Sequence, residues 1–145
     1  MKEPTAPQKM FVYGTLMRGF YNYEKALAGQ EISMVPARTR GRVWHMTNRG
    51  YPAIQAGDGW VYGELVTLKD FAAVIDLMDE IEGYHGPDDP RNEYARLLAP
   101  VENLETGQME QAYVYHYVRD DLGTPENPAI ELPHGSWRKF MEEEH

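Results

Sequence analysis

One carboxylate in this sequence occupies a position where ionisation is costly. A helix is expected to end at Gly83, and its apolar side chains recur at helical spacing over Phe71–Ile81. Counting about 100° per residue from Phe71, these side chains span roughly 280° through 40°, and Glu82 falls near 20°, on the same face. A buried carboxylate needs either dedicated partners or a raised pKa, and both suit a residue that transfers protons. The alternative is that Glu82 bends out to solvent or pairs with an arginine such as Arg96.

A second candidate site follows the first expected strand, at Tyr13-Gly14-Thr15-Leu16, with Gly19 close behind. A glycine that leaves a strand allows several backbone N–H groups to point into one concavity, which can hold a carboxylate or a phosphate. A simple turn is the alternative interpretation. Neither a GxxxxGK[ST] loop nor a GxGxxG fingerprint occurs, so nucleotide binding is not favoured.

Other site chemistries lack their residues. The chain has no cysteine, which excludes disulfides, thiolate catalysis and cysteine-based metal sites. The histidines show no HxH, HxxxH or HExxH spacing, and a metal site is not expected. Ser33 and Ser136 have no GxSxG context, which argues against a serine hydrolase. The net charge of −9 disfavours nucleic acid and anionic membranes as partners. Arg38, Arg40 and Arg42 alternate in the manner of one solvated sheet face.

These residues must be positioned by several strands and short helices. The strands and helices do not alternate strictly along the chain, which predicts an α+β domain with a mixed or largely antiparallel sheet. Strands are expected at Gln8–Tyr13, Val35–Met46, Tyr51–Gln55, Gly59–Thr67, Tyr94–Val101 and Gln111–Val118. Helices are expected at Asn22–Ala28, from an N-cap at Thr67 to Gly83, and from Ser136 onward. The Pro-containing stretch from Asp120 to Pro133 is expected to cover the domain as a flap or to be mobile.

The length of 145 residues predicts one domain over 1–145, with a loose N-terminal tail at 1–8 and a C-terminal extension at 120–145. No apolar run approaches the roughly 20 residues that span a bilayer, and the N-terminus does not have the pattern of a signal peptide. A cytoplasmic protein is therefore expected.

Six short motifs occur in order between residues 10 and 118. They are Val12-Tyr13-Gly14-Thr15-Leu16 with Gly19, Tyr51-Pro52, Gly63-Glu64-Leu65, Leu77-Met78-Asp79-Glu80-Ile81-Glu82-Gly83-Tyr84, Tyr94-Ala95-Arg96 and Tyr113-Val114-Tyr115. In this order and approximate spacing the set resembles the γ-glutamylcyclotransferase superfamily, in its AIG2-like branch.

The resemblance implies a small, mostly antiparallel β-barrel flanked by short helices. It also implies an intramolecular acyl transfer, in which the α-amine of a γ-glutamyl group attacks its own side-chain carbonyl, leaving 5-oxoproline and releasing an amine. The substrate would be a small γ-glutamyl amine or γ-glutamyl amino acid, with no metal or cofactor. An insertion at 85–91, between Gly83 and Tyr94, is longer than usual in the compact members and leaves the released amine open.

The family's catalytic glutamate precedes a glycine, and this position falls on Glu82. By the same resemblance, the loop from Tyr13 through Gly14 and Thr15 to Leu16 would supply backbone donors for the substrate carboxylate. Tyr94 matches a tyrosine near the acid, and Tyr115 would line the pocket, whereas Tyr84 and Tyr113 are expected to be packing residues. The alternative function is a non-catalytic binding or regulatory module that holds a small amino-acid-like ligand in the same cavity. The oligomeric state is left open.

Overall fold

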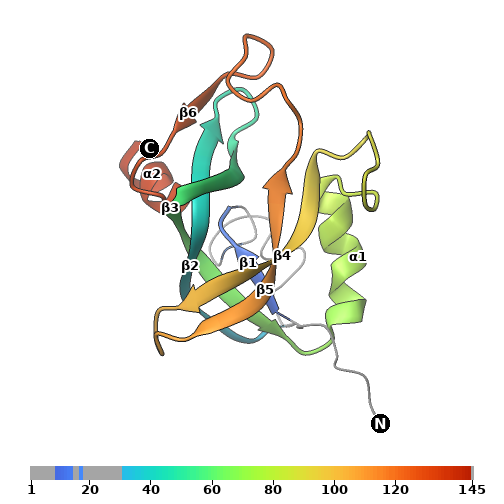
Figure 1. Cartoon of the computed structure of the whole chain (residues 1–145), viewed down its shortest axis with the longest axis vertical. Helices are drawn as coiled ribbons and strands as arrows, with labels where there is room; N and C mark the ends of the chain where they lie inside the picture. Colours follow the sequence, from blue (N-terminus) through green and yellow to red (C-terminus); the bar gives the residue numbers. More distant parts are fainter. Residues whose placement is uncertain (1–8, 15–16, 18–30, 145) are drawn as a thin grey trace.

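The central sheet closes on itself into a barrel (Figure 1). The computed structural model describes residues 9–14, 17 and 31–144, and the structural statements below refer to these residues. Its elements are β1 (Lys9–Val12), β2 (Glu31–Met46), β3 (Tyr51–Leu68), α1 (Phe71–Glu82), β4 (Tyr94–Asn103), β5 (Met109–Tyr117), β6 (Ala129–Glu131) and α2 (Trp137–Glu144).

The strand order is β3-β1-β5-β4-β2, and β2 pairs back onto β3, which completes the ring. The short β6 lies outside the ring and pairs with the end of β2. The β1–β5 pair is parallel, while the other pairs of the ring are antiparallel. The structure therefore confirms the predicted α+β fold, a mostly antiparallel barrel with short helices.

β1 is paired on both sides in the barrel, with β3 and with β5. Met10, Phe11 and Val12 are all buried, which explains why this strand is apolar without alternation. The two strands expected at 51–55 and 59–67 are one continuous β3. Its first part pairs with residues 42–46 of β2 and its second part with residues 33–40, with a register shift between Arg40 and Arg42.

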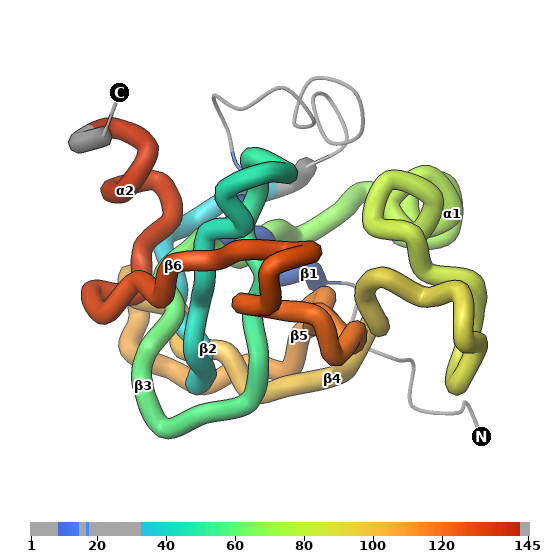
Figure 2. The backbone as a smooth tube through the Cα atoms, turned by 90° about the horizontal axis from the view of Figure 1, so that it is seen from above, coloured from blue at the N-terminus to red at the C-terminus, as the bar shows by residue number. Residues whose placement is uncertain are grey.

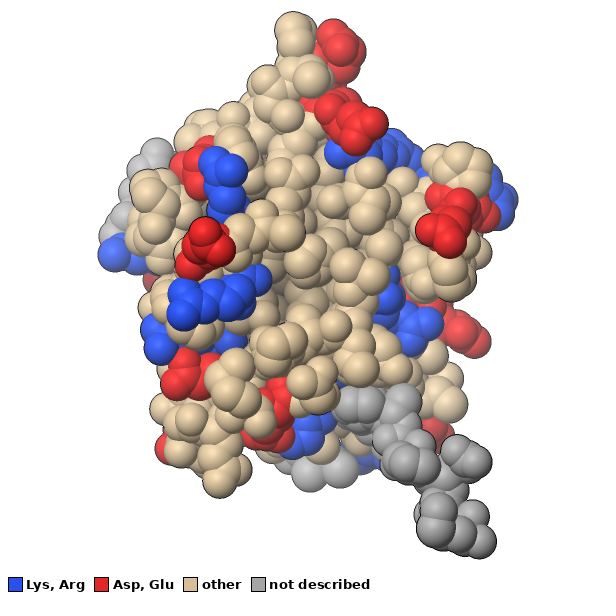
Figure 3. All heavy atoms as spheres, in the orientation of Figure 1, with Lys and Arg blue, Asp and Glu red and all other residues tan. Residues whose placement is uncertain are grey.

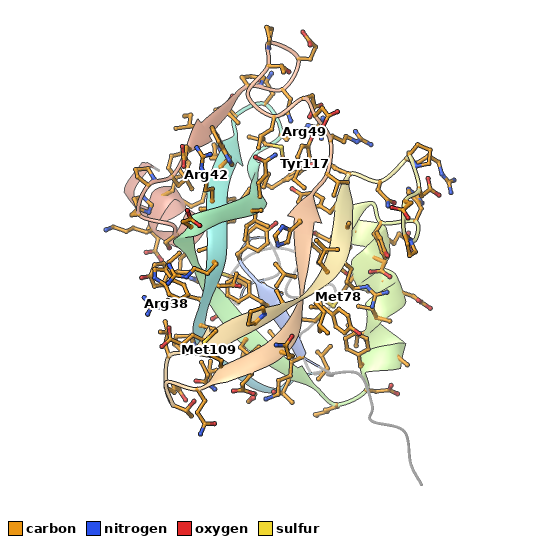
Figure 4. All side chains as sticks on the ribbon, viewed as in Figure 1. Arg38, Arg42, Arg49, Met78, Met109 and Tyr117 are labelled. Atoms are coloured by element: carbon orange, nitrogen blue, oxygen red, sulfur yellow. The ribbon has the colours of Figure 1, made fainter. Side chains whose placement is uncertain are left out.

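α1 packs against the outside of the barrel through Val74, Ile75 and Met78, and Figure 4 shows Met78 on the side of the helix that faces the strands. The prediction of Thr67 as the N-cap is wrong, because Thr67 still belongs to β3 and pairs with Lys9. The cap is Asp70, whose side chain accepts a hydrogen bond from the backbone N–H of Ala73 at 3.2 Å.

α2 lies on the opposite side of the barrel from α1, as Figures 1 and 2 both show. Its first residue, Trp137, is buried and donates from its indole Nε1 to Nδ1 of His45 at 3.0 Å. The stretch before it is tied to the barrel through β6. The predicted helix at Asn22–Ala28 and the predicted tail at 1–8 lie outside the described residues.

Basic side chains gather on one side of the face shown in Figure 3, over β2 and β3, with acidic side chains beside them. Arg38 donates to Glu102 at 2.5 Å, and Arg42 donates through two nitrogens to Glu131 at 2.8 and 2.7 Å. Two guanidinium groups lie over the ring of Trp60, with Cζ of Arg38 at 3.8 Å and Cζ of Arg40 at 3.7 Å from the ring centroid. Ion pairs and ring contacts therefore occupy much of this basic face. Within the described part of the chain, no helix has the length and apolar character needed to cross a membrane.

Candidate active site

The end of α1 fixes the position of Glu82. Gly83 adopts left-handed angles, φ 68° and ψ 37°, which a residue with a Cβ adopts only at a cost. Its N–H donates to the carbonyl of Glu80 at 3.2 Å, and the N–H of Tyr84 donates to the carbonyl of Asp79 at 2.9 Å. These two bonds form a Schellman motif, and Glu82 is the last helical residue before the chain reverses. The left-handed turn at the end of the helix thus explains why a glycine follows Glu82.

The carboxyl group of Glu82 is desolvated, although the residue as a whole keeps partial exposure. Burial raises its pKa to about 8, with further contributions from the carboxylates of Glu93 and Asp79. The carbonyl end of the helix dipole acts in the same direction because it disfavours negative charge. Of the two outcomes expected from the helical wheel, dedicated partners or a raised pKa, the burial of this carboxyl group favours the raised pKa.

Arg96 does not pair with Glu82. Its Nε lies 3.1 Å from Oδ1 of Asp79, one turn earlier in the helix, at ion-pair distance but without hydrogen-bond alignment. Asp79 also accepts a hydrogen bond from the hydroxyl of Tyr115 at 2.6 Å. Burial nevertheless raises the pKa of Asp79, and the hydroxyl of Tyr115 and the guanidinium of Arg96 offset this only in part.

Three buried tyrosines, each in or next to a different strand, lie near Glu82. They are Tyr13 after β1, Tyr94 at the start of β4, and Tyr115 in β5. Burial is the main cause that raises the pKa of Tyr13 and Tyr94, and the nearby Glu82 adds to it in both. The pKa of Tyr115 is raised by burial, by Asp79 and, to a lesser extent, by Glu82. The structure therefore brings together four of the residues named from the sequence.

The tyrosine hydroxyls have partners of their own. Tyr13 donates to the carbonyl of Tyr115 at 2.6 Å, and Tyr94 donates to the carbonyl of Pro52 at 2.5 Å. Because these bonds hold the rings in place, the tyrosines form rigid, neutral walls beside Glu82. Such walls keep water away from the carboxyl group and support its high proton affinity.

The turn after β1 lies against the same end of the barrel. The N–H of Met17 donates to the carbonyl of Gly14 at 3.0 Å. Gly14 is buried, and a Cβ added to it would lie 2.7 Å from Cγ of Pro52, so the close approach requires glycine. Thr15 and Leu16 lie outside the described residues, and their predicted role stays a prediction.

A polar cluster next to Glu82 was not predicted from the sequence. Glu93 accepts a hydrogen bond from the hydroxyl of Tyr51 at 2.7 Å and another from Arg49, through the same oxygen, Oε2. Arg49 lies over the ring of Tyr117, at 6.0 Å, and Figure 4 shows the two side chains close together at the end of β5. The only indication in the sequence was Tyr51, which belongs to one of the six motifs.

A surface pocket of about 480 Å³ lies beside α1. Its lining residues are Asp76, Asp79, Glu80, Tyr84, His85, Gly86, Pro87 and Arg96. Part of the insertion at 85–91 thus forms a wall of this pocket. Glu82, Tyr13, Tyr94 and Tyr115 are not among the residues that line it. Among the described residues, no group of three or more His, Asp or Glu side chains could hold a metal ion.

Known proteins share this fold and this sequence pattern. The family model described as γ-glutamyl cyclotransferase, AIG2-like, matches residues 10–139. The γ-L-glutamyl-butirosin B γ-glutamyl cyclotransferase of Niallia circulans is 28% identical over 135 residues, which are 90% of this chain and 76% of that protein.

Solved structures agree on the fold. An AIG2-like protein from Mus musculus superposes with a TM-score of 0.64 at 24% identity, over 89% of this chain and 86% of that chain. YkqA from Bacillus subtilis gives a TM-score of 0.63 at 20% identity over 94% of this chain, which spans 42% of YkqA.

A closed barrel with a desolvated glutamate at the end of its flanking helix is thus combined with a family match over most of the chain. The protein belongs to the AIG2-like γ-glutamyl cyclotransferase family. Membership indicates an enzyme of the cyclotransferase type that acts on a small molecule.

Proposed function

We propose that this protein cyclises the γ-glutamyl group of a γ-glutamyl amine or γ-glutamyl amino acid to 5-oxoproline and releases the free amine. The observation that carries the proposal is the desolvated Glu82, with its pKa raised to about 8 and with the buried Tyr13, Tyr94 and Tyr115 near it. General acid–base catalysis is most effective when the pKa of the group lies near the working pH.

In the proposed reaction the α-amine nitrogen of the substrate forms a bond to its own γ-carbonyl carbon. The bond between that carbon and the leaving nitrogen breaks. Glu82 takes the proton that the attacking amine loses and returns it to the leaving nitrogen, so that one carboxyl group serves as base and then as acid. The reacting groups are tethered in one molecule, so the protein must mainly hold the folded-back conformer.

We assign that holding role to the loop from Tyr13 through Gly14 and Thr15 to Leu16, with backbone N–H groups facing the substrate carboxylate. The position of this loop is supported by the packing of Gly14 on Pro52, whose carbonyl accepts the hydrogen bond from Tyr94. Tyr94 and Tyr115 would then line the pocket. The released amine is left open, and the name of the Niallia circulans relative gives γ-L-glutamyl-butirosin B as one substrate to try.

The proposal is tested by incubating the protein with a panel of γ-glutamyl compounds and measuring 5-oxoproline by mass spectrometry. The panel contains a γ-glutamyl amino acid, a γ-glutamylamine, ε-(γ-glutamyl)-lysine and γ-L-glutamyl-butirosin B. Glu82→Gln keeps the shape of the side chain but cannot accept a proton, and turnover should fall by about 10²- to 10⁴-fold.

Glu80→Gln is the matched control, because it removes one carboxylate from the exposed side of the same helix turn. It should retain the activity of the wild-type protein. Full activity of Glu82→Gln would contradict the proposal. Ligand binding by calorimetry without any 5-oxoproline would instead favour the non-catalytic binding or regulatory module.

A further inference from the structure

Glu93 is anchored against the helix end that carries Glu82. Its N–H donates to the carbonyl of Gly83 at 3.1 Å, and its carbonyl accepts from the N–H of Val118 at 3.0 Å. A Cβ built on Gly83 would lie 3.3 Å from Cβ and 3.6 Å from Oε1 of Glu93. The Oε1 side of the Glu93 carboxylate therefore faces the Glu82-Gly83 corner.

The other carboxylate oxygen is held from the opposite side. Oε2 accepts hydrogen bonds from Tyr51 and Arg49, and Arg49 also lies 3.5 Å from Oδ2 of Asp121. The side chains of Glu93 and Arg49 are 19% and 25% exposed, so solvent screens this pair only partly. The two carboxylate oxygens thus have different surroundings, with two donors at Oε2 and the helix end at Oε1.

We propose that Glu93 is a positioning residue for the proposed cyclisation, fixing a second carboxylate beside Glu82 and thereby determining how strongly Glu82 holds its proton. This inference rests on the proposed function, because the proton held by Glu82 is the one that moves in the reaction. Arg49 and Tyr51 hold Glu93 in place. The positive charge of Arg49 also offsets part of the negative charge that Glu93 places near Glu82.

Several other groups act on Glu82. They are Asp79 from its own helix and Tyr13, Tyr94 and Tyr115 from the strands, while Arg96 pairs with Asp79. Substituting Asp79 would break the hydrogen bond from Tyr115 at the end of α1, and the tyrosines are neutral at the pH values of interest. Glu93 is therefore the neighbouring charge that a single substitution removes while leaving the α1 end and its tyrosine walls in place.

The test follows two quantities against pH. One is the catalytic efficiency, kcat/KM, with formation of 5-oxoproline as the readout, and the other is the carbon-13 NMR titration of the Glu82 side-chain carboxyl group. Glu93→Gln keeps the size of the side chain and removes its charge, so both midpoints should move down by about one pH unit. Arg49→Gln removes the cation that offsets Glu93, and both midpoints should move up. Opposite shifts from the two variants would not result from simple loosening of the structure.

Glu102→Gln is the matched control. Like Glu93, Glu102 is paired with an arginine, Arg38, but it lies in β4 at the far end of the strand from Tyr94. It should leave both midpoints unchanged. Unshifted midpoints in a folded Glu93→Gln protein would overturn the proposal, as would an equal shift in Glu102→Gln. If Glu93→Gln does not fold, a downward or absent shift in Arg49→Gln overturns it.

The NMR titration also separates this inference from the proposed function. If no γ-glutamyl compound yields 5-oxoproline, the proposed function fails. The effect of Glu93 on Glu82 is then still decided by the NMR midpoints. If turnover is present and the midpoints do not move, only the role of Glu93 fails.

Discussion

Replacing Glu82 with glutamine should stabilise this protein at alkaline pH, although it should remove the proposed activity. The reason is linkage between folding and proton binding. In the folded protein burial raises the pKa of Glu82 from an ordinary value of 4.5 to about 8. Between these two values the native protein keeps the proton, whereas the unfolded chain has released it.

The direction of this pH dependence of stability follows from the number of protons bound in each state. In this interval the unfolded state binds fewer protons than the native state, so raising the pH favours unfolding. Each pH unit lowers the free energy of unfolding by about 1.4 kcal/mol. From pH 4.5 to about 8, the loss from Glu82 alone comes to about 5 kcal/mol, a large part of the stability of a typical domain. Glutamine does not ionise, so the variant avoids this loss.

The assay is urea denaturation of the wild-type and Glu82→Gln proteins at about pH 5, 6.5 and 8, followed by tryptophan fluorescence. The variant should gain stability relative to the wild type as the pH rises, by about 1.4 kcal/mol per unit. Taking the difference between the two proteins cancels the other titrating groups. Glu80→Gln, on the exposed side of the same turn, should show no such gain. Parallel curves for the wild-type and Glu82→Gln proteins would mean that the carboxyl group is not desolvated.

Two further substitutions test the packing around the site. Tyr115→Phe removes the hydroxyl that donates to Asp79 at 2.6 Å and should lower the free energy of unfolding by about 1–2 kcal/mol in urea denaturation; an unchanged value would mean that Arg96 alone satisfies Asp79. Gly14→Ala would place a Cβ 2.7 Å from Cγ of Pro52 and should cost about 1–3 kcal/mol, seen as a lower melting temperature. An unchanged melting temperature would show that the Pro52 ring moves aside freely.

The parts of this fold that depend on local pattern could be predicted from the sequence. Helical spacing from Phe71 to Ile81 gave both α1 and the face on which Glu82 lies, because the wheel needs only residue order. The N-cap was placed three residues too early. Thr67 has a suitable side chain for an N-cap, but its backbone belongs to β3 and pairs with β1 and β2. The local sequence pattern does not show this pairing.

Contacts between distant segments could not be predicted in the same way. Tyr51 and Arg49 contact Glu93 across separations of 42 and 44 residues. Tyr51 belongs to a short motif, but nothing in the type or spacing of either residue links it to Glu93. Tyr94 and Tyr115 were named only through a family resemblance, since barrel closure is what brings the strand ends together. Closure depends on strand register, which no single motif of this chain specifies.

The distribution of counter-charges at the end of α1 links stability to function. Asp79, Glu80 and Glu82 lie near the carbonyl end of the helix, with no basic residue in the last turn, an arrangement that the helix dipole disfavours. Asp79 accepts a hydrogen bond from Tyr115 and lies at ion-pair distance from Arg96, and Glu80 is exposed to solvent. Glu82 instead faces two carboxylates and neutral tyrosine walls. A helix optimised for stability would have a lysine or arginine here, so the high proton affinity of Glu82 comes at the expense of helix stability, as is common at functional sites.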